Sequence, residues 1–193
     1  MEPRLFTFAG GTSGQWEILW LRAVRGEPLR SAPRLAVVSG RPDQPVRQVH
    51  WQLSGVTSHE RYVTVHERQS LRARQPSLGR PQATQAALIP IRKNAAWWGM
   101  AQDERRHLFE ETSRHVAKGL RYLPAIARRL HHCRDLDPRE PFDFLTWFEY
   151  APGDAAAFED LVSELRATEE WRFVERECDL RLTRSSPDGG NRG

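Results

Sequence analysis

Apolar and polar residues alternate along most hydrophobic stretches of the chain, a pattern typical of half-buried β-strands. In the N-terminal part such stretches lie at residues 5–8, 15–21, 35–38 and 48–56. The glycine-rich segment 10–14 separates the first two, so they are predicted to form a hairpin. Residues 58–74 are polar and charged, and their pattern does not decide between helix and loop.

The C-terminal part combines strand patterns with two amphipathic helices. Strands are predicted at residues 86–92, 126–135, 142–150 and 171–182. Less polar residues recur every three or four positions over 103–122, which predicts a helix that ends before Pro124. A second helix is predicted to begin at Asp154, with the Asp154 side chain as its cap. The order strand, helix, strand, strand, helix, strand is that of a ferredoxin-like α+β fold.

The change of pattern divides the chain into residues 1–85, residues 86–183 and a tail, residues 184–193. The tail has no large apolar side chain, so it is expected to be disordered. With 193 residues, 39% of them hydrophobic, the chain can form a core without disulfides or a structural metal. Cys133 and Cys178 have no metal-binding or haem-attachment spacing and are expected to be buried thiols.

Two features bear on location and partners. The longest apolar run is far shorter than the ~20 residues that span a bilayer, and the first residues lack the pattern of a secretory signal. We therefore expect no membrane association and a cytoplasmic location. Of the 29 basic residues, 27 are arginine. They are scattered among acidic residues rather than clustered, so no nucleic-acid partner is expected. An arginine-rich interaction module that binds polyanions in a salt-sensitive way is the alternative from another class.

Few residues could carry chemistry. His115 lies on the less polar face of the helix predicted over 103–122, where a histidine is usually part of the core. No second histidine lies three or four positions from His115. If His115 binds a metal, a porphyrin would therefore have to supply the other ligands of that metal. Arg128 could pair with a carboxylate such as Glu149, or it could hold an anion beside a metal. His131 and Cys133 share one side of a strand, but no metal site is expected there.

Lys93 and Trp97 form a second candidate pair. An ammonium and an indole N–H four positions apart could together bind a carboxylate. The alternative is a surface lysine beside buried tryptophans.

Seven segments of the C-terminal part together resemble the chlorite dismutase family, most closely its short, dimeric lineage. They are residues 87–93, 95–98, 103–106, 122–128, 132–136, 141–150 and 166–171. The likeness extends from about residue 6 to residue 182. It implies two ferredoxin-like halves of βαββαβ type in a dimeric α+β barrel, with non-covalent haem b in the second half and a homodimer or a larger ring as the assembly.

The resemblance also implies an activity, the conversion of chlorite to chloride and dioxygen. By family position, His115 is the proximal ligand of the iron, and Glu170 accepts the other ring N–H of this histidine. Such a bond orients the imidazole and raises its donor strength. Arg128 is the distal residue that retains the hypochlorite intermediate. This arginine is absent from the haem-biosynthetic decarboxylases of the family, so that activity is not expected.

The remaining family positions line the cofactor. Leu123 shapes the distal cavity, and Gln75 matches a glutamine that hydrogen-bonds the distal arginine in some members. Lys93, Tyr62 and Trp97 correspond to partners of the haem propionates and to the cavity rim. A haem peroxidase or haem-handling protein of the same fold is the alternative function.

Overall fold

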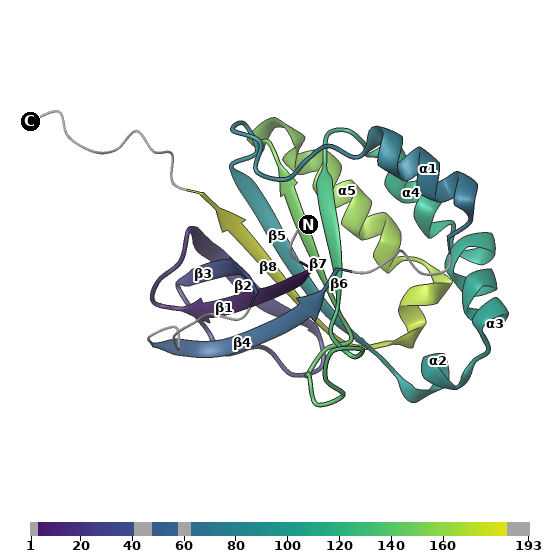
Figure 1. The fold of residues 1–193 in the computed structure, drawn as a ribbon, viewed down its shortest axis with the longest axis horizontal. Coiled ribbons are helices and arrows are strands. Elements are labelled where there is room, and N and C mark those ends of the chain that lie inside the picture. The colour runs from purple at the N-terminus through teal and green to yellow at the C-terminus, as the bar shows by residue number, and fades with distance from the viewer. Residues whose placement is uncertain (1–3, 41–47, 58–62, 185–193) are drawn as a thin grey trace, which may run out of the picture.

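Eight antiparallel strands form a closed barrel at the centre of the molecule (Figure 1). The computed structural model describes residues 4–40, 48–57 and 63–184. The strands are β1 (Leu5–Gly11), β2 (Trp16–Arg25), β3 (Arg34–Ser39), β4 (Val49–Val56), β5 (Gln85–Lys93), β6 (Ala127–His132), β7 (Phe144–Tyr150) and β8 (Val174–Thr183). Figure 1 shows the helices on the side of β5, β6, β7 and β8.

The order of the strands around the barrel is β1-β3-β2-β8-β5-β7-β6-β4, and β4 pairs with β1 to close it. The predicted hairpin between residues 5–8 and 15–21 is therefore wrong, because β3 lies between β1 and β2. Glycines 10, 11 and 14 do not form a tight turn between two adjacent strands. Instead, β1 pairs with β3 and β4. Within each set of four strands the spatial order is the same: fourth, first, third, second.

Helices occupy the connection between β4 and β5 and the connections within residues 86–183. They are α1 (Val65–Arg74), α2 (Ala95–Gly99), α3 (Gln102–Arg106), α4 (His115–Arg121) and α5 (Ala155–Arg166), with a π-helical turn at His107–Thr112 and 3₁₀ turns at Pro152–Asp154 and Glu169–Phe173. Residues 86–183 thus follow the predicted ferredoxin-like order. In the described parts of residues 1–85, no helix separates β1 from β2 or β2 from β3, so the βαββαβ order is not found there.

Two hydrophobic layers result from the alternation of side chains along β5. Ala86 and Leu88 point into the barrel, where they pack with Phe8, Trp16 and Trp147. The intervening positions on the outer face pack under α5. This outer layer includes Ala87, Ile89, Ile91, Phe148, Phe158, Leu161 and Val162. The barrel core supports the sheet from within, and the outer layer supports the face that carries the helices.

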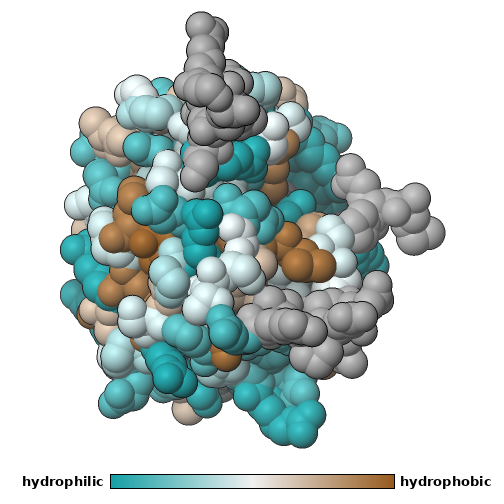
Figure 2. All heavy atoms as spheres, turned by 90° about the vertical axis from the view of Figure 1, so that its left-hand side faces the viewer, coloured by the Kyte–Doolittle hydropathy of each residue, from teal (hydrophilic) through white to brown (hydrophobic). Residues whose placement is uncertain are grey.

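Most of the large hydrophobic side chains that are exposed among the described residues belong to β2. Leu19, Trp20 and Val24 are exposed there. Figure 2 views the molecule from the side opposite the helices and shows separate brown patches among hydrophilic residues.

Three local predictions need correction. The predicted continuous helix over 103–122 is interrupted, because a π-helical turn follows α3 and Arg114 adopts a left-handed conformation with φ 54°. Asp154 makes no capping hydrogen bond, because a 3₁₀ turn leads directly into α5. The last strand begins at Val174 rather than at residue 171, because 169–173 form the second 3₁₀ turn.

Other predictions can be compared directly. Cys133 and Cys178 are buried free thiols, as predicted, and burial raises the pKa of both. Within the described ranges no helix is long and apolar enough to cross a membrane. The predicted tail lies outside the described residues except for Arg184.

Candidate active site

A cavity of about 910 Å³ lies between the outer face of the sheet and the helices α1, α4 and α5. Most of its lining is apolar and comes from β5, β6 and β7 on one side and from the helices on the other. The apolar lining includes Ile89, Ile91, Val116, Leu130, Phe144, Phe148, Leu161 and Val162. This volume is at the upper end of the ~300–1,000 Å³ typical of small-molecule sites. The described residues that were predicted for the site, Gln75, Lys93, Trp97, His115, Leu123, Arg128 and Glu170, all line this cavity.

The break between the π-helical turn and α4 determines the position of His115. This histidine is the first residue of α4 and directly follows Arg114, whose left-handed backbone turns the chain between the π-helical turn and α4. The Glu110 carboxylate accepts from the backbone N–H groups of Val116, at 2.6 Å, and Ala117, at 3.3 Å, and so caps α4 from the preceding turn. The Phe109 ring stacks on the imidazole with centroids 4.4 Å apart. The ring therefore has a fixed place at the cavity wall.

Glu170 fixes the orientation of the His115 ring. Nδ1 of His115 lies 2.9 Å from Oε2 of Glu170 and donates to it, which leaves Nε2 as the ring nitrogen for a metal. The backbone N–H of Glu170 donates to Ser113 Oγ, so the carboxylate is anchored beside α4. An ionised carboxylate can only accept, which assigns the proton to Nδ1.

Lys93 neutralises this buried carboxylate. Its ammonium donates to Oε1 of Glu170 at 2.8 Å and to the backbone carbonyl of Glu170 at 3.2 Å. Burial alone would raise the pKa of Glu170, but the Lys93 ammonium and the His115 ring lower it to about 2. The carboxylate is therefore ionised throughout the physiological range. An ionised acceptor increases the electron-donating strength of the imidazole.

The Lys93 side chain is buried beside Trp97. Its side chain is 1% exposed and its ammonium lies 4.4 Å from the centre of the Trp97 ring. Lys93 is thus an interior cation bound to Glu170, and the alternative of a surface lysine is wrong. The carboxylate that its ammonium binds belongs to the protein itself.

Arg128 stands on β6, on the same side of the strand as Leu130, and lines the cavity. The amide of Gln75 donates to the backbone carbonyl of Arg128 at 2.5 Å, so the predicted contact between these two residues involves the main chain of the arginine. Glu149, the alternative partner of Arg128, instead accepts from Gly79 N–H and from the indole of Trp147. Tyr62 lies outside the described residues.

The comparisons identify the family. The sequence model described as "Chlorite dismutase" matches residues 43–185. The chain belongs to the chlorite dismutase family. A crystal structure of dimeric chlorite dismutases from Nitrobacter winogradskyi is 58% identical in sequence, with a TM-score of 0.85 over 93% of this chain and 99% of that one.

Two more distant relatives extend the comparison. The chlorite dismutase of Ideonella dechloratans is 33% identical over 88 residues, which are 46% of this chain and 28% of that protein. The match therefore spans less than a third of that relative. The structure of chlorite dismutase from Candidatus Nitrospira defluvii in complex with imidazole shares the fold, with a TM-score of 0.69, 21% identity and coverage of 96% and 93%.

Membership in the chlorite dismutase family implies haem, and the residues present fit that group. Within the described ranges, no group of three or more His, Cys, Asp and Glu side chains could hold a bare metal ion. His115 is instead a single oriented nitrogen ligand at the wall of a large, mostly apolar cavity. A single protein ligand suits a metal whose other ligands come from a porphyrin.

Several residues of the site could not be predicted from motifs. Glu110 caps a helix that begins five residues after it, a spacing outside the capping-box pattern. Phe109 stacks on His115 from a π-helical turn, whose extra residue per turn a 3.6-residue period does not reveal. Trp171 lies near the Lys93 ammonium. In the sequence, only its position directly after Glu170 indicated that it belongs to the site.

Proposed function

We propose that the protein is a haem b enzyme that converts chlorite to chloride and dioxygen. The observation that carries this proposal is one cavity that contains both His115, oriented by an ionised carboxylate, and Arg128. Family membership and the 58% identical relative support it. The reaction is balanced without a co-reactant, because both oxygen atoms of chlorite leave as O₂ and chlorine leaves as chloride.

Three residues hold the cofactor in this proposal. His115 binds the iron through Nε2, Glu170 keeps the ring in one orientation, and Lys93 keeps Glu170 ionised. Haem, when bound, supplies the redox chemistry that transfers oxygen from chlorite. Buried, ionised Glu170 raises the donor strength of His115 and so favours the oxidised states of the iron.

Arg128 binds the anions of the reaction. A guanidinium is permanently charged and offers several N–H donors, so it can hold chlorite and retain the hypochlorite formed from it without moving a proton. We propose that Gln75 positions the Arg128 main chain and that Leu123 limits the size of the distal cavity. Trp97 lies against Lys93, and we retain Tyr62 as a partner of the haem propionates.

The proposal is tested by measuring oxygen release with an electrode when chlorite is added to haem-reconstituted protein. A rapid burst is expected, well above that of free haem at equal concentration. Haem binding without oxygen release would favour the alternative, a peroxidase or haem-handling protein. An absent Soret band on haem titration would favour the arginine-rich interaction module instead.

The role of Arg128 is tested by Arg128→Ala. We expect this variant to release hypochlorite, detected with a trapping dye, and to bleach its haem after fewer turnovers than the parent. Arg92→Ala is the matched control, because Arg92 is half exposed and pairs with Glu175 away from the cavity. Equal turnover and equal bleaching in the two variants would exclude the proposed role.

The assembly and the halves of the chain complete the proposal. We propose a homodimer, on the basis of the dimeric relative; light scattering should then give about twice the chain mass of 22.3 kDa.

We further propose that residues 1–85 and 86–183 are two ferredoxin-like halves. The same spatial order of strands in each set of four supports this division, although the described parts of the first half contain no helix between its strands.

A further inference from the structure

One face of α1 carries a row of basic side chains along the cavity. Arg68 and Arg72 line the cavity, and Gln75, at the end of α1, lines it as well. These positions are four and three residues apart, so they lie on one side of the helix. At 1.5 Å per residue, Arg72 is about 4.5 Å and Arg68 about 10.5 Å along the helix from Gln75. The row therefore leads to Gln75, which is bonded to Arg128.

The two arginines have no carboxylate partner within the described parts of the chain. The acid on their own helix, Glu67, is bound by both terminal nitrogens of Arg106, at 2.8 and 2.7 Å. Glu170, which lines the cavity, is neutralised by Lys93. The other cavity carboxylate, Glu177, accepts from Arg166 and from the indole of Trp171. Among the described residues, therefore, no carboxylate pairs with either arginine of the row.

Local stability does not explain this arrangement. Arg68 and Arg72 are like charges four residues apart on a helix, a spacing that destabilises it. In addition, Nε of Arg68 is buried and has no hydrogen-bond partner within the described residues. A buried donor without a partner is unfavourable unless a ligand or solvent satisfies it.

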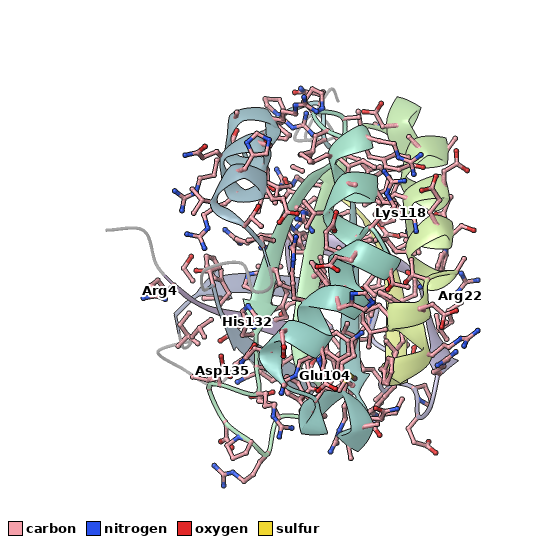
Figure 3. The ribbon with its side chains drawn as sticks, turned by 90° about the vertical axis from the view of Figure 1, so that its right-hand side faces the viewer. Arg4, Arg22, Glu104, Lys118, His132 and Asp135 are labelled. Atoms are coloured by element: carbon pink, nitrogen blue, oxygen red, sulfur yellow. The ribbon has the colours of Figure 1, made fainter. Side chains whose placement is uncertain are left out.

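We propose that Arg68 and Arg72 form an anion-guiding row that delivers chlorite to Arg128. In Figure 3, α1 lies beside α4, the helix that begins with His115, so the row reaches the site from the side of α1. Guanidinium groups placed one after the other along the helix raise the local concentration of a small anion and attract it from solution. The chloride product can leave by the same path. This inference rests on the proposed function for the identity of the anion.

The test compares the double variant Arg68→Gln/Arg72→Gln with Arg74→Gln in haem-loaded protein. Arg74 is exposed on the same helix but does not line the cavity, so it controls for the loss of helix charge. At ~10 mM ionic strength we expect kcat/KM for chlorite to fall roughly tenfold in the double variant, with kcat unchanged. The difference should nearly vanish at ~0.5 M salt, where screening is strong. Arg74→Gln should change kcat/KM by no more than about twofold.

A neutral substrate separates guidance from damage to the site. The rate of reaction with hydrogen peroxide should be the same in the double variant and the parent, because peroxide carries no charge. A parallel loss with chlorite and peroxide, or equal effects of the double variant and Arg74→Gln, would overturn the inference.

Chloride binding provides a readout that does not depend on turnover. The ³⁵Cl NMR line of sodium chloride should be broadened by the parent and by Arg74→Gln, and less so by the double variant. If the parent releases no oxygen from chlorite, the proposed function fails, yet this experiment still decides whether the row binds anions. Equal broadening by all three proteins would overturn the row as an anion site.

Discussion

Among the individual side chains of the site, Glu170 has the largest electrostatic consequence, because it is buried and contacts both His115 and Lys93. In Glu170→Gln the Lys93 ammonium stays buried without its counter-charge, which costs roughly 3 kcal/mol in the free energy of unfolding. The variant should also raise the haem reduction potential, because a neutral amide makes His115 a weaker donor. Denaturant unfolding and a spectroelectrochemical titration measure the two effects.

The matched control is Glu169→Gln, since Glu169 is 46% exposed and pairs with Arg172 at the surface. It should change neither the free energy of unfolding nor the haem reduction potential appreciably.

The same pair of variants also tests how the stability of the protein depends on pH. The folded pKa of Glu170 is about 2, below its ordinary value of 4.5, so its stabilising contribution is present above pH 4.5 and is lost as the pH falls toward 2. Stability should therefore fall more steeply between pH 4.5 and 2 in the parent than in Glu170→Gln, and parallel curves would contradict the ion-pair account.

The role of a residue could be predicted from the sequence only where the residues that contact it lie nearby in the chain. The pattern alone left His115 as either a core residue or a ligand, because the carboxylate that orients it lies 55 positions away. The resemblance indicated Glu170, whereas the placement of Lys93 depended on contacts across the chain. A lysine becomes an interior cation only when the tertiary structure brings a buried carboxylate to it, and no local pattern encodes that event.

At the level of single elements, the segment from α3 to α4 determines where His115 stands. Its hydrophobic period continues across the break, so the sequence predicted one helix over 103–122. The structure interrupts it at Arg114, and Glu110 compensates by accepting from the first backbone N–H groups of α4, which have no partner within the helix. The hydrophobic period shows which face of a helix is buried, but it does not show whether every backbone hydrogen bond is made. For this reason the break in the helix was not predicted.

Removal of the Glu110 cap should loosen the start of α4. We expect Glu110→Ala to lower the free energy of unfolding by about 1 kcal/mol, as for other lost helix caps. Haem affinity should fall as well, since His115 is the first residue of the helix that is released. Glu111→Ala is the control, because Glu111 is 61% exposed and contacts only the exposed His107 in the described contacts. Equal haem dissociation rates in the two variants would show that the cap does not support the ligand.

For the molecule as a whole, alternation along the chain placed most of the strands but not their neighbours. The pairing of β2 with β8 joins residues more than 150 positions apart, and no turn signal marks it. The ferredoxin-like order of residues 86–183 was predictable because helices and strands alternate there in a recognisable sequence. The first four strands share the spatial order of the last four, yet the described residues between them form no helix, and the local pattern predicted a hairpin between the first two.

The contact between α5 and the barrel depends on a buried ionic cluster. Arg166 of α5 donates to Glu177 at 2.8 Å and to Asp179 at 2.7 Å, and both carboxylates of β8 are fully buried. In Arg166→Met two buried negative charges lose a shared partner, which should cost about 3–5 kcal/mol in the free energy of unfolding. Arg172→Met should cost less than about 1 kcal/mol, because that ion pair is exposed to solvent. Urea unfolding of both variants measures the difference, and similar midpoints would mean that apolar packing alone attaches α5 to the barrel.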